Sequence, residues 1–386
     1  MRMKVRGPRS RWLGAGLVLG MALAGPVQAE AGCPPAGGWA TPGGEPVDSA
    51  ALYAELATAD AVLIGEHHDR MDHHRWQLGT LAALHGYRPD LVIGLEMLPR
   101  SKQPVLDAWV AGELAPEAFL EASEWYTHWG FDPALYWPIL HFARVHAIPL
   151  LALNLERDKI RSLGHDGWDA LDAELRDGVT APAPASTAYR AYLDAVLERH
   201  PTGMRPNRDR FIATQLAWDR MMAGAIAQRI EAGGAEPPLV AALIGSGHLE
   251  YGYGVPHQLA DLGIEAAPVL LPRAPGDCSD TDPALARAVF GVPADPRFEP
   301  AGPMLGVQIE SADSGVRILG VQDGSVAART DLKAGDRVLR AGEREVNSTT
   351  DLQRVVRGVQ PGTWLPLEIE RDGEHLERVA RFPRED

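Results

Sequence analysis

The chain has 386 residues, with 37 Lys and Arg against 52 Asp and Glu, so its formal net charge is −15. This length suggests two or three domains. The acidic excess argues against a nucleic-acid partner, because a nucleic-acid interface needs clustered basic side chains. Only two cysteines are present, which excludes a disulfide-dense scaffold, and 45% hydrophobic residues are enough for buried cores.

The first 29 residues have the layout of a secretory signal. Basic residues up to Arg11 precede an apolar stretch over 12–24, and the small-residue site Val27-Gln28-Ala29 follows. The apolar stretch is shorter than the roughly 20 residues that a membrane span needs. We therefore predict a cleaved signal peptide over 1–29 and export to the periplasm, with association with the outer membrane left open.

Cys33 raises two alternatives for the exported chain. Ala31-Gly32-Cys33 resembles the end of a lipidation box, but Glu30 stands where an aliphatic residue is expected, which argues against a lipid anchor. In an oxidising compartment Cys33 could instead pair with Cys278. The sequence alone does not establish that the two cysteines meet.

Short apolar runs alternate with helical patterns from about residue 48 to residue 272. The expected strands cover 61–65, 91–97, 149–154, 239–245 and 267–271, and the expected helices cover 71–85, 104–122, 136–147, 187–199 and 207–232. Strands that are apolar throughout are typical of a parallel sheet buried on both faces. We predict an α/β domain over 48–272 with a mostly parallel sheet flanked by helices. The segments 30–47 and 162–186 are expected to be loose or loop-like.

The proline-rich segment 273–303 is predicted to be a linker to a small, mostly β domain over 304–386. Within that domain, strand-like runs cover 306–309, 316–321, 337–341, 365–371 and 375–382, and one helix fits 349–357. Asp372-Gly373 between two strand-like runs is typical of a tight hairpin.

Polar side chains gather where the predicted strands end. Glu66 and His68 follow the first strand, Glu96 lies on the second, Asn154 ends the third and His248 follows the fourth. Ligands of open α/β sheets bind beyond the carboxyl ends of the strands, so we expect these residues to line one pocket. Imidazole and carboxylate groups suit a divalent transition metal, for which Glu66, His68 and His248 are the predicted ligands. Imidazole or phenolate can equally hold haem iron.

The same segments carry a family resemblance. Residues 62–69 (VLIGEHHD), 94–97 (GLEM) and 245–248 (GSGH) follow one another as in ChaN-type haem-binding domains of the Tiki/TraB-like superfamily, which the region resembles over about 48–272. The resemblance implies haem as cofactor and leaves a homodimer open. The residues predicted to bind the cofactor are His248, Tyr251, Tyr253, Glu96, Asn154, Arg157, Gln215, Asp219 and Met222.

The C-terminal region carries a second resemblance. Met304-Leu305-Gly306-Val307 resembles the carboxylate-binding loop of PDZ domains, and 332–339 (LKAGDRVL) matches the bacterial modules. The resemblance implies that a protein C-terminus adds as a strand and is captured at Leu305, Gly306 and Val307. A structural cap without a free groove is the alternative.

Three functions remain after these observations. The first is an exported haem- or iron-binding protein in haem uptake or handling, with a peptide-docking PDZ domain. The second is a metal-dependent hydrolase of the Tiki/erythromycin-esterase kind, in which Glu66 or His68 is the catalytic general base. The third is a scaffold in which only the PDZ domain acts.

Overall fold

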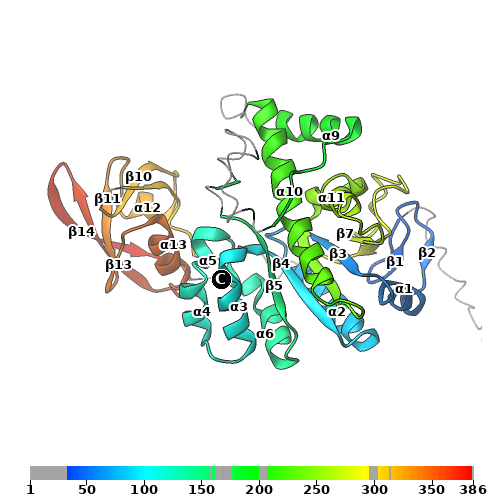
Figure 1. Ribbon diagram of the computed structural model, residues 1–386. Helices are drawn as coiled ribbons and strands as arrows, with labels where there is room; N and C mark the ends of the chain where they lie inside the picture. The colour runs from blue at the N-terminus through cyan, green and yellow to red at the C-terminus, as the bar shows by residue number, and fades with distance from the viewer. Residues whose placement is uncertain are drawn as a thin grey trace, which may run out of the picture.

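The computed structural model describes residues 33–156, 159–160, 168, 176, 178–199, 207–294, 303–312 and 314–384. The predicted signal peptide, most of the segment 162–186 and Arg157 lie outside the described residues. Figure 1 shows an α/β domain, coloured blue to yellow, beside a smaller β-rich domain in orange and red. Within the described ranges, no helix combines the length and the apolar character that crossing a bilayer requires.

The α/β domain is built on an eight-stranded sheet in the order β2-β1-β8-β7-β3-β6-β4-β5. Neighbouring strands run parallel from β8 to β5, and β1 pairs antiparallel with both β8 and β2 towards the other edge. The strands are β1 (Trp39–Ala40), β2 (Pro46–Val47), β3 (Ala61–Glu66), β4 (Leu91–Pro99), β5 (Leu150–Asn154), β6 (Leu239–Gly245), β7 (Val269–Arg273) and β8 (Ala288–Gly291). The predicted fold class, a mostly parallel α/β sheet, is confirmed.

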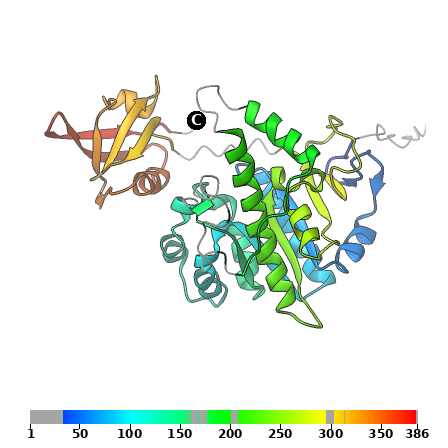
Figure 2. The ribbon, with the colours of Figure 1, turned by 45° about the horizontal axis from the view of Figure 1, so that its top comes forward.

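Helices cover both faces of this sheet. One face carries α1 (Ser49–Leu56), α2 (Met71–Tyr87), α3 (Gln103–Val110), α4 (Pro116–Ala122), α5 (Trp125–His128) and α6 (Trp137–Val145). The other carries α10 (Arg208–Glu231) and α11 (Val255–Asp261), and α9 (Thr187–Glu198) packs on α10. Figure 2 shows the long green helix α10 packed over the sheet.

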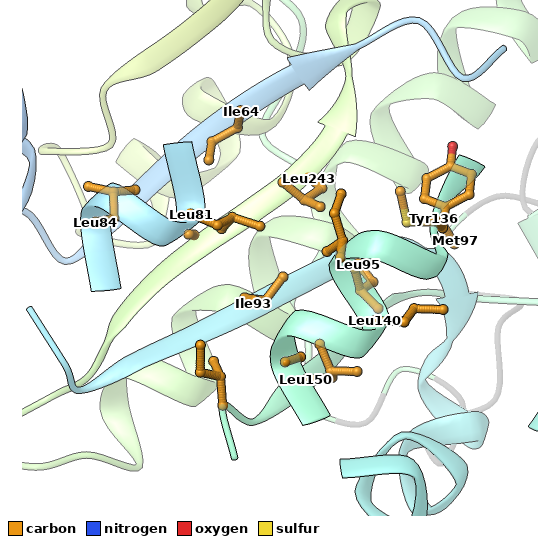
Figure 3. Packing of buried hydrophobic residues seen from close by; sticks show 14 of the residues in the cluster. Ile64, Leu81, Leu84, Ile93, Leu95, Met97, Tyr136, Leu140, Leu150 and Leu243 are labelled. Carbon is orange, nitrogen blue, oxygen red and sulfur yellow. The ribbon is translucent and has the colours of Figure 1, made fainter. Parts of the chain in front are cut away.

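Alternate side chains of each central strand enter opposite cores. On β4, Ile93 and Leu95 point to the α2–α6 side, whereas Val92 points to the α10 side. Because strand side chains alternate in direction, a run that is apolar at every position buries both faces. Figure 3 shows Ile93, Leu95, Leu140 and Leu150 filling the space between strand and helix.

Three predicted segments differ from the structure. The segment 30–47, expected to be loose, contains the short strands β1 and β2. The single helix expected over 104–122 is two helices, α3 and α4, because the chain turns at Gly112, whose φ is +82°. The predicted linker also begins too early, since β8 lies within it and pairs with β7 and β1. The prolines of this segment do not prevent a four-residue strand between them.

A disulfide joins Cys33 to Cys278. It ties the beginning of the described chain to the connection between β7 and β8. The pairing that the sequence left open is therefore present in the structure, and the Cys33 Sγ atom is engaged in it.

The C-terminal domain is an antiparallel sheet in the order β14-β13-β11-β10-β9, with β12 paired to β11. Its elements are β9 (Val307–Ser311), β10 (Val316–Val321), α12 (Val326–Arg329), β11 (Arg337–Ala341), β12 (Arg344–Glu345), α13 (Thr349–Arg357), β13 (Trp364–Arg371) and β14 (Glu374–Arg381). Asp372 and Gly373 both have positive φ and form the expected hairpin turn.

The two domains touch where α13 meets α5. The Arg357 guanidinium donates to the Gly130 carbonyl at 2.8 Å and lies 5.4 Å from the centre of the Tyr126 ring. Arg354 contacts the same ring at 5.9 Å. Figure 1 shows α13 beside α5.

Candidate functional site

A pocket of about 450 Å³ opens at the carboxyl ends of β3 and β6. Strand β3 ends at Glu66 and is followed by His68, and β6 ends at Gly245 and is followed by the 3₁₀ turn Ser246–His248. Because the two strands are parallel neighbours, with Glu66 opposite Gly245, their polar ends meet at one edge. The lining residues are Glu66, His67, His68, Asp69, Phe131, Gly245, Ser246, Gly247 and His248.

Glu66 is a buried carboxylate surrounded by donors. Its Oε1 atom lies 2.8 Å from His68 Nδ1 and accepts a hydrogen bond from the Tyr136 hydroxyl at 2.7 Å. Its Oε2 atom lies 3.4 Å from Nδ1 of the buried His74. Burial alone would raise the pKa of Glu66, but the two histidines outweigh it and hold that pKa well below the usual range. Glu66 is therefore ionised at neutral pH.

His248 has a comparable carboxylate partner on helix α10. Its Nδ1 atom lies 2.6 Å from Asp219 Oδ1, and the Tyr189 hydroxyl donates to Asp219 Oδ2 at 2.7 Å. Burial lowers the pKa of His248, but the carboxylates of Asp219 and the buried Glu96 outweigh burial and raise this pKa to about 9. His248 is consequently an imidazolium at neutral pH when no ligand is bound.

The two histidines thus present the same atom to the pocket. In each ring Nδ1 is held by a carboxylate, which leaves Nε2 as the nitrogen able to bind a ligand. The His68 Nε2 atom lies 3.1 Å from where a Cβ on Gly245 would stand. Burial lowers the pKa of His68, as does the nearby His248, but the carboxylates of Glu66 and Glu96 raise it by more, so the net shift is upward.

Glu96 is fixed between these histidines. Its Oε2 atom accepts from the Gly245 backbone N–H at 2.6 Å, and its Oε1 atom lies 3.9 Å from His248 Nε2. Asn154, at the end of β5, donates to the Glu96 carbonyl at 2.8 Å. Asn154 therefore supports the backbone of the site and does not face the pocket directly.

Aromatic rings surround the histidines. The His68 ring lies 4.6 Å from that of Trp129 and 5.2 Å from that of Phe131. The His248 ring lies 5.2 Å from that of Trp218. Phe131 supplies rigid apolar area in the pocket wall itself, whereas Trp129 and Trp218 pack against the histidine rings without lining the pocket.

Other predicted cofactor-binding residues lie farther from the pocket. Tyr251 donates to Asp280, and its ring stacks on that of Tyr253 at 5.2 Å, while Tyr253 also lies 5.9 Å from the Tyr189 ring. Gln215 is half-buried on α10, one turn before Asp219. Met222 is fully buried in the core between α10 and the sheet, so its predicted contact with the cofactor is not supported, because core packing uses its side chain.

Sequence reasoning missed some residues that shape the site. Tyr189 orients Asp219, Phe131 lines the pocket, and Ser246 has a buried Oγ atom with no hydrogen-bond partner among the described residues. Tyr189 and Phe131 approach through tertiary packing from distant segments, which no local motif indicates. Ser246 lies in the GSGH motif, where the sequence indicates a nucleophile only weakly, because the G-x-S-x-G pattern is missing.

The donor set fits haem better than a bare metal ion. Among the described residues, no group of three or more His, Cys, Asp or Glu side chains is placed to hold a metal ion. Two imidazoles with carboxylate-fixed rings and neighbouring aromatic faces are instead suitable for haem iron and its macrocycle. The side-chain-free Gly245 and Gly247 keep one wall open.

The hydrolase alternative is not favoured. A general base works best with a pKa near the operating pH, whereas the pKa of Glu66 is far below it.

The predicted peptide-binding residues lie at one end of the C-terminal domain. Leu305 is 4% exposed, Gly306 has φ +79°, and Val307 begins β9. A Cβ on Gly306 would stand 2.3 Å from the Ser325 side chain, so only glycine fits there. Strand β9 ends the order of its sheet and therefore offers an edge for strand addition.

Comparison with known families gives two matches. The model of the family described as "Haem-binding uptake, Tiki superfamily, ChaN" matches residues 52–259, more than half of the chain. The model described as "PDZ domain" matches residues 303–378. No curated protein matches the chain.

Several solved structures resemble parts of the chain. The solved structure described as "Cofacial heme binding to ChaN of Campylobacter jejuni" is 21% identical in sequence. The match covers 64% of this chain and 92% of that chain, with a TM-score of 0.49. The HtrA3 PDZ domain bound to a phage-derived ligand is 20% identical over 20% of this chain and 82% of its own, with a TM-score of 0.19. The serine endoprotease from Yersinia pestis is 23% identical over 21% of this chain and 29% of its own, with a TM-score of 0.19.

Proposed function

Because the chain belongs to the ChaN family of haem-binding uptake proteins in the Tiki superfamily and also carries a PDZ domain, we propose that it is an exported protein that takes up or hands on haem and docks on a partner's C-terminus. The observation that carries the proposal is the pair of histidines, His68 and His248, whose Nδ1 atoms are both held by carboxylates in one pocket.

In this proposal the residues of the chain bind and orient haem. His68 or His248 supplies the nitrogen that binds iron, while Glu66 and Asp219 hold the rings in place. The Trp129, Phe131 and Trp218 rings flank the macrocycle. Haem supplies the redox-active iron, and the protein controls access to it.

Two observations support export. Disulfides persist in oxidising compartments, and Cys33 is paired with Cys278. The layout of residues 1–29 is that of a signal peptide. A Cys33 Sγ atom held in a disulfide cannot also carry a thioether-linked lipid, so we propose a periplasmic protein without a lipid anchor at this residue.

Haemin titration of the mature chain tests the haem function. We expect a saturable change in the visible spectrum that weakens about tenfold or more in His68→Ala or His248→Ala, whichever binds iron. His375→Ala is the matched control, because this exposed histidine lies on β14, outside the pocket. Unsaturable binding, or equal loss in the control, contradicts the proposal.

A further inference from the structure

A second cavity, of about 740 Å³, lies where the peptide groove of the C-terminal domain faces the α/β domain. One side is formed by Leu305, Val307 and Ile309 from β9 and its loop, together with Leu352 and Val356 from α13. The other side is formed by Asp69, Phe131, Asp132 and Leu135 of the α/β domain. The groove is thus completed by residues from outside the PDZ domain.

The haem pocket and the groove have a common wall. Asp69 and Phe131 line both cavities. Phe131 packs on His68 with ring centres 5.2 Å apart, and His68 Nδ1 lies 2.8 Å from Glu66. A ligand that displaces Phe131 from the groove side therefore acts directly on a histidine of the haem pocket.

The contact between α13 and α5 holds this wall in place. The Arg357 guanidinium donates to the carbonyl of Gly130, the residue immediately before Phe131. Arg357 belongs to the helix that forms one side of the groove. A shift of α13 would therefore act on the backbone beside Phe131 through this hydrogen bond.

The groove also indicates the chemistry of its occupant. Its PDZ side is apolar around Leu305, Leu352 and Val356, which suits an apolar C-terminal residue. Arg357 also lines this cavity, but its guanidinium is engaged with the Gly130 carbonyl and the Tyr126 ring. The carboxylates of Asp69 and Asp132 on the opposite side therefore favour a basic side chain farther up the peptide. The edge of β9 supplies the backbone groups for an added strand.

We propose that a partner's C-terminus, with an apolar last residue and a basic residue upstream, docks in this two-domain groove and weakens haem binding through the common wall. This inference rests on the proposed haem function. A macrocycle held at His68 or His248 would share with the peptide the wall formed by Asp69 and Phe131, because these two residues line both cavities. Each ligand therefore opposes the other, and docking on a partner promotes release of haem.

The test uses the full mature chain. An array of immobilised peptides with free C-termini, randomised over the last four positions, identifies the tightest binder. The same peptide with an amidated C-terminus is the control that should not bind. Haemin is then titrated with and without a saturating concentration of that peptide. We expect about fivefold or greater weakening of haemin affinity, and the same factor for peptide affinity when haemin is saturating, because linkage is reciprocal.

Two variants locate the coupling. Phe131→Ala should bring the ratio of haemin affinities with and without peptide close to one. Trp364→Ala, a truncation of an aromatic ring that is 66% exposed on β13, should keep the full ratio. Asp69→Asn combined with Asp132→Asn should remove the preference for a basic residue in the array.

The outcomes distinguish failure of the haem function from failure of the docking and linkage proposal. Haemin that does not bind without peptide overturns both. Normal haemin binding with no peptide selected overturns only the docking proposal. If both ligands bind and haemin affinity is unchanged or increased, the opposing linkage is wrong, while the haem function stands.

Discussion

At the scale of single residues, the site depends on buried charges that are paired before any ligand arrives. Asp219 stabilises the protonated form of His248, and Glu66 is stabilised by His74 and His68. An unpaired charge at such depth would be strongly unfavourable. Substitutions of one partner should therefore change both stability and its dependence on pH.

The His248–Asp219 pair predicts a loss of stability at alkaline pH. The folded pKa of His248 is about 9, above its ordinary value of 6.5, so its contribution is full below pH 6.5 and is lost as pH rises through 9. We expect urea unfolding of the haem-free protein to lose about 3 kcal/mol from this pair between pH 6 and pH 10. Asp219→Asn should remove most of that loss.

Asp194→Asn is the control, because Asp194 forms an ion pair with Arg208 that does not involve His248. It should keep the alkaline loss of the wild-type protein. Equal pH profiles for wild type and Asp219→Asn would contradict this assignment.

Tyr136 is predicted to stabilise the ionised Glu66. Tyr136→Phe removes a buried hydroxyl that donates to Glu66 at 2.7 Å, and we expect a loss of about 1–3 kcal/mol in the free energy of unfolding. Tyr87→Phe provides the comparison, since Tyr87 is 48% exposed and should change stability little. Equal small effects in both variants would show that the Glu66 bond is not important.

Gly245 is predicted to be indispensable for the pocket. A Cβ there would lie 2.8 Å from His68 Cε1 and 3.1 Å from its Nε2, so Gly245→Ala must displace the histidine. We expect the haemin affinity, measured by visible titration, to fall about tenfold or more. Gly79→Ala is the control, because nothing lies within 4 Å of its added Cβ. Unchanged haemin binding in Gly245→Ala would show that His68 does not contribute to the haem site.

At the scale of elements, continuous apolar runs predicted the central strands to within a few residues, because burial on both faces leaves a local signal. The short strands β1, β2 and β8 carried no such signal, since each is only two to four residues long. The clustering of Glu66, Glu96 and His248 was predictable from their positions at parallel strand ends. The approach of Tyr189, Phe131 and α13 was not, because it depends on how distant segments pack.

Helix α13 should be sensitive to its N-terminal cap. Ser348 and Asp351 form a reciprocal capping box that satisfies backbone donors at the start of the helix. Ser348→Ala should destabilise the C-terminal domain by about 1 kcal/mol and reduce affinity for the selected peptide, measured by fluorescence anisotropy. Ser186→Ala removes the cap of α9 in the other domain and should leave peptide affinity unchanged. Unaltered affinity in Ser348→Ala would mean that α13 does not shape the groove.

At the scale of the whole molecule, one covalent bond closes a long section of chain. The cysteines of the disulfide are 245 residues apart in sequence. Cross-linking such distant residues restricts the unfolded chain, so Cys33→Ser should cost about 2–5 kcal/mol, measured by denaturant unfolding without reductant. Adding reductant should destabilise the wild-type protein to the same level and leave Cys33→Ser unaffected. A wild-type protein indifferent to reductant would contradict a stabilising role.

The same bond divides the molecule topologically. All of the α/β domain except β8 lies within the covalent ring, whereas β8 and the peptide-docking domain follow Cys278 and lie outside it. A protease that cuts once anywhere between the two cysteines leaves both fragments attached, and the haem-binding half stays together. A cut after Cys278 instead separates the docking domain from the ring. Proteolysis of this protein in its compartment would therefore detach the partner-binding function and spare the haem-binding one.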